Sequence, residues 1–128
     1  MYRVGNQKLS STDLLIPVAA GEVIREATMV AVNEDGYAVA ASKAEGLMTA
    51  GCALAFTDNM SGDAGGVNVP VRRGAFVWAN DGSIERTDLL KDAYVSDAVT
   101  VTLTATGSSR AGKILAVDDD GAVTVDMI

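Results

Sequence analysis

Residues 88–128 alternate apolar and polar side chains over much of their length, and this period of two restricts the fold more than any other feature. Successive side chains of a β-strand point to opposite faces, so such alternation is typical of strands with one buried face. The stretch turns at the acidic corner DDDG (118–121) before the strand-like run 122–125. Glycine adopts positive φ without a steric clash, as tight hairpin turns require. The last third therefore predicts short antiparallel strands.

The acid–glycine corner occurs twice more, at Asp35-Gly36 and at Asp81-Gly82. The first lies between the apolar runs 28–32 and 37–40, which predicts a hairpin. Other strand-like runs are 46–57, 67–71, 75–78, 99–103 and 114–117. In the run 99–103 the valines and Leu103 share one predicted face, and the threonines share the other. Pro70 cannot donate a backbone hydrogen bond, so we expect its nitrogen to face away from a ladder. The pattern predicts roughly eight to ten short strands.

Composition narrows the core that these strands can enclose. The 128 residues are 48% hydrophobic but only 5% aromatic, so Val, Ala, Leu, Ile and Met must fill the interior. Such side chains suit a thin space, either between two sheets or inside a narrow barrel. We therefore predict a mainly all-β fold, a small β-sandwich or β-barrel of short strands with at most one or two short helical turns. The one candidate turn is 87–91, capped by Thr87 or Asp88.

The first 20 residues differ from the rest. They are polar, then briefly apolar at 14–18, and no tight hairpin partner follows. This predicts an extended N-terminal arm over 1–20 and a β-domain over 21–128. An ordinary first strand within 1–20 is the alternative that the pattern leaves open.

Charge and motifs exclude several classes of function. The net charge of −7 disfavours nucleic acid, since phosphates repel an acidic surface. No signal peptide and no run long enough to span a membrane is visible, so we expect no membrane partner and synthesis in the cytosol. The segment 107–113 matches the phosphate-loop pattern, but Ile114 replaces the magnesium-binding Ser or Thr and a strand-like run follows. The acidic corner 118–121 lacks the glutamate of a calcium loop, because Met127 stands there.

Catalysis is not expected. The chain has no histidine and a single cysteine, Cys52, among small apolar neighbours, so we predict no enzyme activity, no cofactor and no metal site. Phe76 and Trp78 would share one strand face, with Tyr94 later in the chain. These aromatic residues are the basis of an alternative function, a glycan- or receptor-binding module displayed on a surface.

A series of strand ends and turns carries a family resemblance. In order they are VRRGAF (71–76), DLLKDAYVSD (88–97), VTV (99–101), SRAG (109–112) and VDDDGAVTV (117–125). The chain resembles the capsid cement, or head decoration, proteins of tailed bacteriophages, over about residues 20–128.

The resemblance implies a structural β-domain on the outer surface of the virion, made in the host cytoplasm. Its partner would be the major capsid protein, whose subunits it would hold together as a homotrimer, with an N-terminal arm reaching over neighbours. An arm or edge strand can add to a partner's sheet. On this basis we expect the interface to include Leu14, Leu15, Ile16, Pro17, Val18, Arg72 and Arg73.

Overall fold

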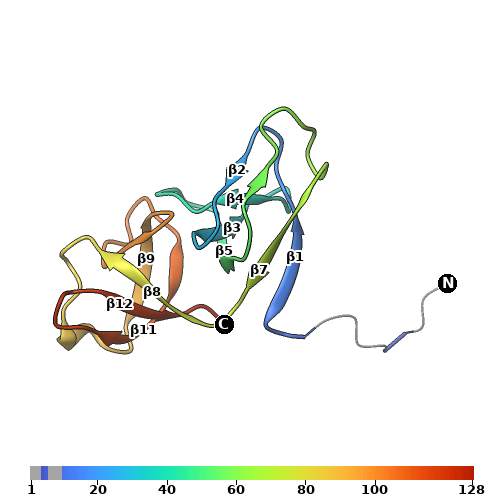
Figure 1. The fold of residues 1–128 in the computed structure, drawn as a ribbon. Helices are drawn as coiled ribbons and strands as arrows, with labels where there is room; N and C mark the ends of the chain where they lie inside the picture. Colours follow the sequence, from blue (N-terminus) through green and yellow to red (C-terminus); the bar gives the residue numbers. More distant parts are fainter. Residues whose placement is uncertain (1–3, 6–9) are drawn as a thin grey trace.

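Two β units lie side by side in the structure, a computed structural model that describes residues 4–5 and 10–128 (Figure 1). The described residues form twelve strands and one short 3-10 helix. This confirms the prediction of a mainly all-β fold. It also answers the question of barrel or sandwich, because a curled five-stranded sheet is joined to a closed five-stranded barrel.

The first unit is an antiparallel sheet in the order β1-β7-β5-β3-β4. Its strands are β1 (Asp13–Pro17), β3 (Met29–Val32), β4 (Ala38–Ala40), β5 (Met48–Ala53) and β7 (Asn68–Arg72). A short pair, β2 (Val23–Ile24) with β6 (Thr57–Asp58), accompanies it. The sheet curls, because Val18, just after β1, forms a parallel bridge with Ala38 on the opposite edge strand. The first core includes Val30, Val69 and Val71, all fully buried.

The second unit is a closed barrel in the order β10-β8-β12-β11-β9. Its strands are β8 (Ala75–Asn80), β9 (Asp92–Asp97), β10 (Thr100–Thr102), β11 (Arg110–Val117) and β12 (Val123–Asp126). All neighbours are antiparallel except β10 and β8, which are parallel and close the barrel. Closure leaves no free edge. Val95, Val101, Ile114, Val123 and Val125 are fully buried inside it, as expected for a narrow interior filled by branched side chains.

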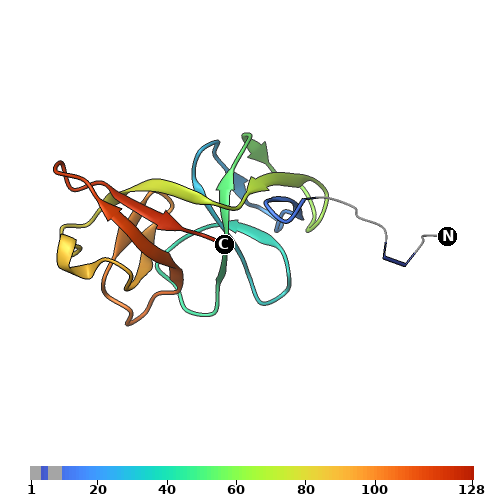
Figure 2. The ribbon, with the colours of Figure 1, turned by 90° about the horizontal axis from the view of Figure 1, so that it is seen from below.

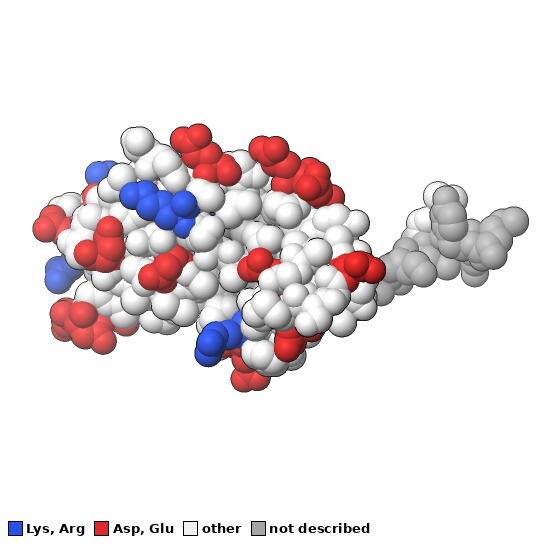
Figure 3. Space-filling model, turned by 90° about the horizontal axis from the view of Figure 1, so that it is seen from above, with Lys and Arg blue, Asp and Glu red and all other residues white. Residues whose placement is uncertain are grey.

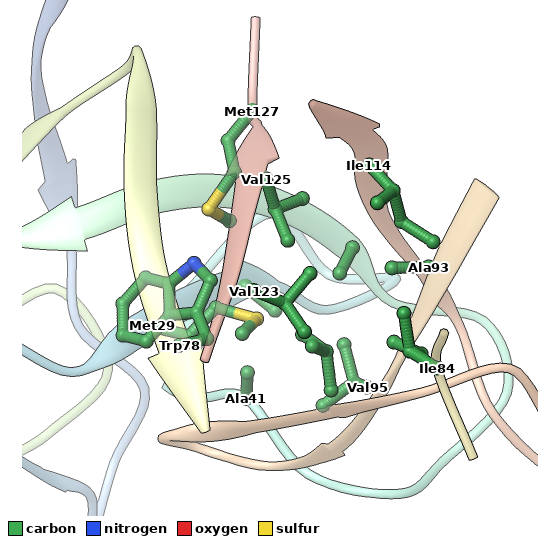
Figure 4. Close-up of a cluster of buried hydrophobic side chains, with 13 residues drawn as sticks. Met29, Ala41, Trp78, Ile84, Ala93, Val95, Ile114, Val123, Val125 and Met127 are labelled. Carbon is green, nitrogen blue, oxygen red and sulfur yellow. The ribbon is translucent and has the colours of Figure 1, made fainter. Parts of the chain in front are cut away.

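The two cores meet on β3. Val30 belongs to the first core, whereas Met29 and Ala31 belong to the second core. Figure 4 shows Met29 beside Trp78 in that second core. All three residues are fully buried. A strand covered on both faces is a continuous apolar run rather than an alternating one, and the sequence MVAV of β3 has this form.

Hydrogen bonds also join the units. The Met29 N–H donates to the Ala98 carbonyl at 2.7 Å. The Thr49 hydroxyl on β5 approaches the carbonyls of Arg110 and Ala111 on β11, at 2.9 and 3.0 Å. The last residues of the chain lie between the two units (Figure 2), where the Met127 N–H donates to the Gly74 carbonyl at 2.8 Å. The units therefore form one body.

The predicted arm over residues 1–20 is wrong for part of its length. Residues 13–17 form β1, which pairs with β7 along its whole length, and Val18 is fully buried. The alternative prediction, an ordinary first strand, is therefore correct for residues 13–17. The partner strand β7 is distant in the sequence, so no hairpin turn next to β1 indicates the pairing. Residues 1–3 and 6–9 of the predicted arm lie outside the described residues.

Two local predictions need correction. The helical turn is a 3-10 helix over Arg86–Asp88, which begins one residue earlier and ends three residues earlier than expected, and its N-cap is Glu85 in place of Thr87 or Asp88. The predicted open face of threonines is wrong at Thr102, because Val101 and Thr102 of β10 are both buried. A register shift also interrupts the β9–β10 ladder, where Ser96 of β9 is left without a partner on β10.

Gly112 on β11 generates the first testable prediction. A Cβ at this position would overlap the carbonyl of Asp126 and the side chain of Val125 on the neighbouring strand β12. Because backbone cannot move aside without breaking the barrel ladder, Gly112→Ala should lower the free energy of unfolding by about 3 kcal/mol. The control is Gly36→Ala, where φ is +87° but the surrounding space is open, and where we expect a loss of about 1 kcal/mol. Urea unfolding measures both, and equal losses would contradict the argument from close backbone approach.

Candidate interaction surface

An exposed apolar row crosses the outer face of β1, β7 and the end of β5. Leu15 lies opposite Pro70 in the β1–β7 register, and the Leu54 N–H donates to the Pro70 carbonyl at 2.9 Å. Leu15 is 62% exposed and Leu54 is 40% exposed. We call Leu15, Pro70 and Leu54 the apolar row. Strand alternation produces it, because Ile16 and Val71 point into the core and their neighbours must point outward.

Phe56 extends the apolar surface at the end of the row. It follows Leu54 by two residues, and its ring is 61% exposed. A single exposed apolar residue is normal on a protein surface, whereas neighbouring ones mark a contact site. Leu15, at one end of the apolar row, lies on β1, which is an edge strand of the sheet.

β1 is an edge strand, and its backbone can take part in binding. The Val18 N–H donates to the Val67 carbonyl and the Arg73 N–H to the Thr12 carbonyl, so even-numbered residues of this segment face β7. In an antiparallel pair every second residue directs its backbone N–H and C=O away from the partner strand, and in β1 these are the odd-numbered residues. The N–H and C=O of Leu15 therefore lie along the free edge, while Pro17 has no N–H to offer. This edge can accept a short strand from a partner, and Pro17 limits its length.

An exposed ion pair borders the row. The Arg72 Nε donates to the Asp13 Oδ1 at 2.9 Å, across the first register pair of β1 and β7. The hydrogen bond from Arg72 holds the pKa of the Asp13 carboxyl below its ordinary value. Both side chains are about half exposed, so solvent screens the pair and it adds little to stability.

Arg73 lies in a second feature, the inter-unit groove. This groove has a volume of about 260 Å³ and runs between β5, β11 and the last residues of the chain. Arg73 Nη1 donates to the Ser11 carbonyl at 3.4 Å, and the groove also holds Arg110, whose Nε donates to Asp92 at 2.8 Å. Met48, 74% exposed, is among the apolar residues of the lining. Two guanidinium groups beside apolar side chains suit a carboxylate with an apolar neighbour.

The structure separates the predicted interface residues into three groups. Leu15, Arg72 and Arg73 are accessible to a partner. Leu14 and Pro17 are half-buried, and Leu14 packs against the first core. Ile16 and Val18 are 9% and 0% exposed and belong to that core, so they are structural residues rather than contact residues.

Sequence reasoning missed Leu54, Phe56 and Met48. The run 46–57 was predicted as one strand with Leu54 and Phe56 near its centre, but β5 ends at Ala53. Beyond that point the apolar side chains are no longer covered by a neighbouring strand. The signal that could have found them is the length of the run, because a strand of about 5–6 residues is typical.

The aromatic residues do not form a binding platform. Phe76 and Trp78 lie 6.2 Å apart between ring centroids, as expected for one strand face, but that face points inward. Trp78 is 5% exposed and packs in the second core (Figure 4). The expectation that Trp78, Phe76 and Tyr94 recognise a glycan is therefore wrong in its main residue. A small-residue core needs its few large side chains for filling.

The other motifs behave as turns. Residues 110–117, within and after the apparent phosphate loop, form strand β11, and the Gly121 N–H donates to the Asp118 carbonyl in a tight turn at 2.8 Å. Among the described residues no group of three or more His, Cys, Asp or Glu could hold a metal ion.

Cys52 is half-buried against the second core, and burial raises the pKa of its thiol.

Charges are spread thinly over the surface. Figure 3 shows acidic residues scattered over one face, with wide uncharged areas between them. In the part of the chain that the structure describes, no helix is long and apolar enough to cross a membrane.

Comparisons with protein-family models, with curated proteins and with solved structures found no match to this chain.

The Asp13–Arg72 pair generates a second prediction. Arg72→Ala should let the pKa of Asp13 rise toward its ordinary value, and the melting temperature at neutral pH should barely change because the pair is exposed. A carboxyl whose pKa is lower in the folded chain than in the unfolded chain stabilises the fold at pH values above the unfolded pKa. This contribution is lost as the pH falls through the lowered pKa of the folded chain. That acid-side dependence should weaken in the variant. Carboxyl NMR titration measures it, with the exposed Arg25→Ala as the control that leaves Asp13 unchanged.

Proposed function

We propose that this chain is a structural capsid decoration, or cement, protein. It binds the outer surface of a tailed-bacteriophage head and stabilises contacts between subunits of the major capsid protein. The role is one of binding, without catalysis or a cofactor. The observation that carries the proposal is the exposed apolar row, Leu15, Pro70 and Leu54, on a rigid β-body. The sequence motifs at its strand ends and turns support it, because they resemble those of that family.

The physics of a filled head favours such a body. A pressurised shell fails where its subunits separate, so a molecule that buries surface on two neighbours resists that separation. The fused units hold the apolar row and the inter-unit groove in a fixed geometry, which reduces the entropy lost on binding. As a homotrimer the protein would engage several subunits at once, and effective concentration would make modest contacts strong together.

Charge and edge geometry agree with this role. A net charge of −7 keeps free copies apart and disfavours contact with packaged DNA. The free edge of β1 at Leu15 can add to a sheet of the shell, with the apolar row packing beside the new strand. Pro17 stops extended pairing between free copies.

Binding to capsids tests the proposal. Purified protein is mixed with undecorated heads of the phage that encodes it, and co-sedimentation and the temperature of head rupture are measured. We expect saturable binding, a higher rupture temperature, and a mass of three chains for the bound unit. Leu15→Asp should weaken binding about tenfold or more, because it places a charge in an apolar contact.

Met60→Asp is the matched control, since Met60 is also 62% exposed but lies in a turn outside the row. It should bind like the natural chain. Failure of the natural chain to sediment with heads would overturn the proposed function. Equal binding by Leu15→Asp and the natural chain would remove the apolar row from the interface.

A further inference from the structure

The chain enters β1 through a turn on the outer edge of the first sheet. The Asp13 N–H donates to the Ser10 carbonyl at 3.3 Å, and the Ser10 hydroxyl donates to the Asp13 carboxylate, also at 3.3 Å. A backbone hydrogen bond between the first and fourth residues of a segment marks a β-turn, which reverses the direction of the chain. A segment that continues this turn before Ser10 therefore runs antiparallel to β1.

The turn lies on the side of β1 that faces away from β7. Even-numbered residues of β1 pair their backbone groups with β7, so odd-numbered residues direct theirs to the outer edge. Asp13 and Leu15 are both odd-numbered. The hydrogen bond from Asp13 to Ser10 is therefore the first rung of a ladder on this edge, and the second rung falls at Leu15.

The register of this ladder brings an apolar residue to the open side of the first core. In a hairpin closed by Ser10 and Asp13, Leu9 lies opposite Leu14. Leu14 is half-buried and packs against the first core, and β1 has no neighbouring strand among the described residues on its outer side. Side chains directly opposite each other in an antiparallel pair lie about 5 Å apart. Leu9 would thus cover the side of Leu14 that β7 leaves open.

The next position in the same register adds hydrogen bonds and charge. Lys8 lies opposite Leu15, so the N–H and C=O groups of these two residues form the second rung. The carbon stem of Lys8 can run along the exposed Leu15 side chain, with its ammonium group diagonally across from Asp13. Asp13 already accepts a hydrogen bond from Arg72, so this charge contact orients Lys8 and adds little stability. Pro17 has no N–H and ends the ladder.

The distribution of charge along the chain favours the chain's own N-terminal segment as the occupant of this edge. The first nine residues carry Arg3 and Lys8 and no acid, so the rest of the chain has 8 basic and 17 acidic residues. An acidic body attracts a basic segment, and the short connection through Ser10 gives that segment a high effective concentration at β1. A second copy of the protein has no such connection and carries the same net negative charge.

We propose that residues 6–9 form a short strand on the outer edge of β1 and cover this edge in the free protein. These residues, the covering strand, lie outside the part of the chain that the structure describes. Val4, which precedes them, is described and is 91% exposed, as expected for chain beyond the stop at Pro17.

The covering strand is held weakly enough to leave. Ser11 and Thr12, the central residues of the turn, lack the positive φ of the turns that tight hairpins favour, so the turn splays the two strands. A strand from any partner must displace the covering strand before it pairs with Leu15. The inference goes beyond the proposed function, because it concerns the free protein and holds whether or not the chain binds a capsid.

Amide hydrogen exchange at Leu15 in the full chain, measured by NMR, tests the covering strand. The Leu15 N–H donates to the Lys8 carbonyl, so it should exchange about tenfold more slowly in the natural chain than in Lys8→Pro, which breaks the second rung. Gln7→Pro is the matched control, because the N–H at position 7 faces away from β1 and its loss costs no rung. Lys8→Gln, which keeps the N–H, should also retain the slow exchange.

Leu14 serves as the internal reference, since its N–H pairs with β7 and should exchange equally in all four proteins. A nuclear Overhauser effect between the α-protons of Leu9 and Leu14 should accompany the slow exchange at Leu15. Equal exchange at Leu15 in the natural chain and in Lys8→Pro would overturn the inference. Slow exchange that appears only as the protein concentration rises would assign the edge to a second copy and overturn it as well. Neither result bears on binding to heads, so the proposed function stands or fails separately.

Discussion

The burial of one short strand, β3, on both of its faces is the constraint on which the rest of the structure depends. Val30 completes the first core, and Met29 and Ala31 complete the second. Burying a side chain such as that of Met29 contributes roughly 1.5–3 kcal/mol. Pulling the units apart would return Met29 and Ala31 to water and break the Thr49 hydroxyl contacts to β11. Neither unit is complete without the other, which makes the molecule one rigid body.

Rigidity of this kind matters more for a binding protein than for its own stability. Surfaces on different units keep a fixed distance and orientation, so a partner that matches both meets no cost of hinge closure. At Gly51 and Gly112 the paired strands approach so closely that a Cβ would overlap a backbone carbonyl of the neighbouring strand.

The sequence predicted what depends on neighbours in the chain and missed what depends on distant pairing. Gly36 and Gly121 determine the turns of two hairpins locally, and both hairpins are present. The pairing of β1 with β7, and the closure of the barrel, leave no local signal. In the candidate site, the alternation of inward and outward side chains distinguishes the exposed Leu15 from the buried Ile16. This distinction could have been predicted only if residues 13–17 had been interpreted as a strand rather than as an arm. The left-handed conformation of Leu90 could not be predicted, since it opposes the preference of leucine.

Net charge and local charge have opposite effects on association here. The charge of −7 repels a second copy or any acidic partner at long range, but salt reduces this force beyond about 8 Å at physiological ionic strength. At contact distance the local groups decide, and Arg73 places a positive charge in the inter-unit groove. An acidic segment that reached this groove would gain attraction and apolar burial together. Random contacts with the acid-bearing face of Figure 3 gain neither. On the proposed function, specificity would follow from where basic residues lie beside exposed apolar ones, and the acidic excess would suppress other encounters.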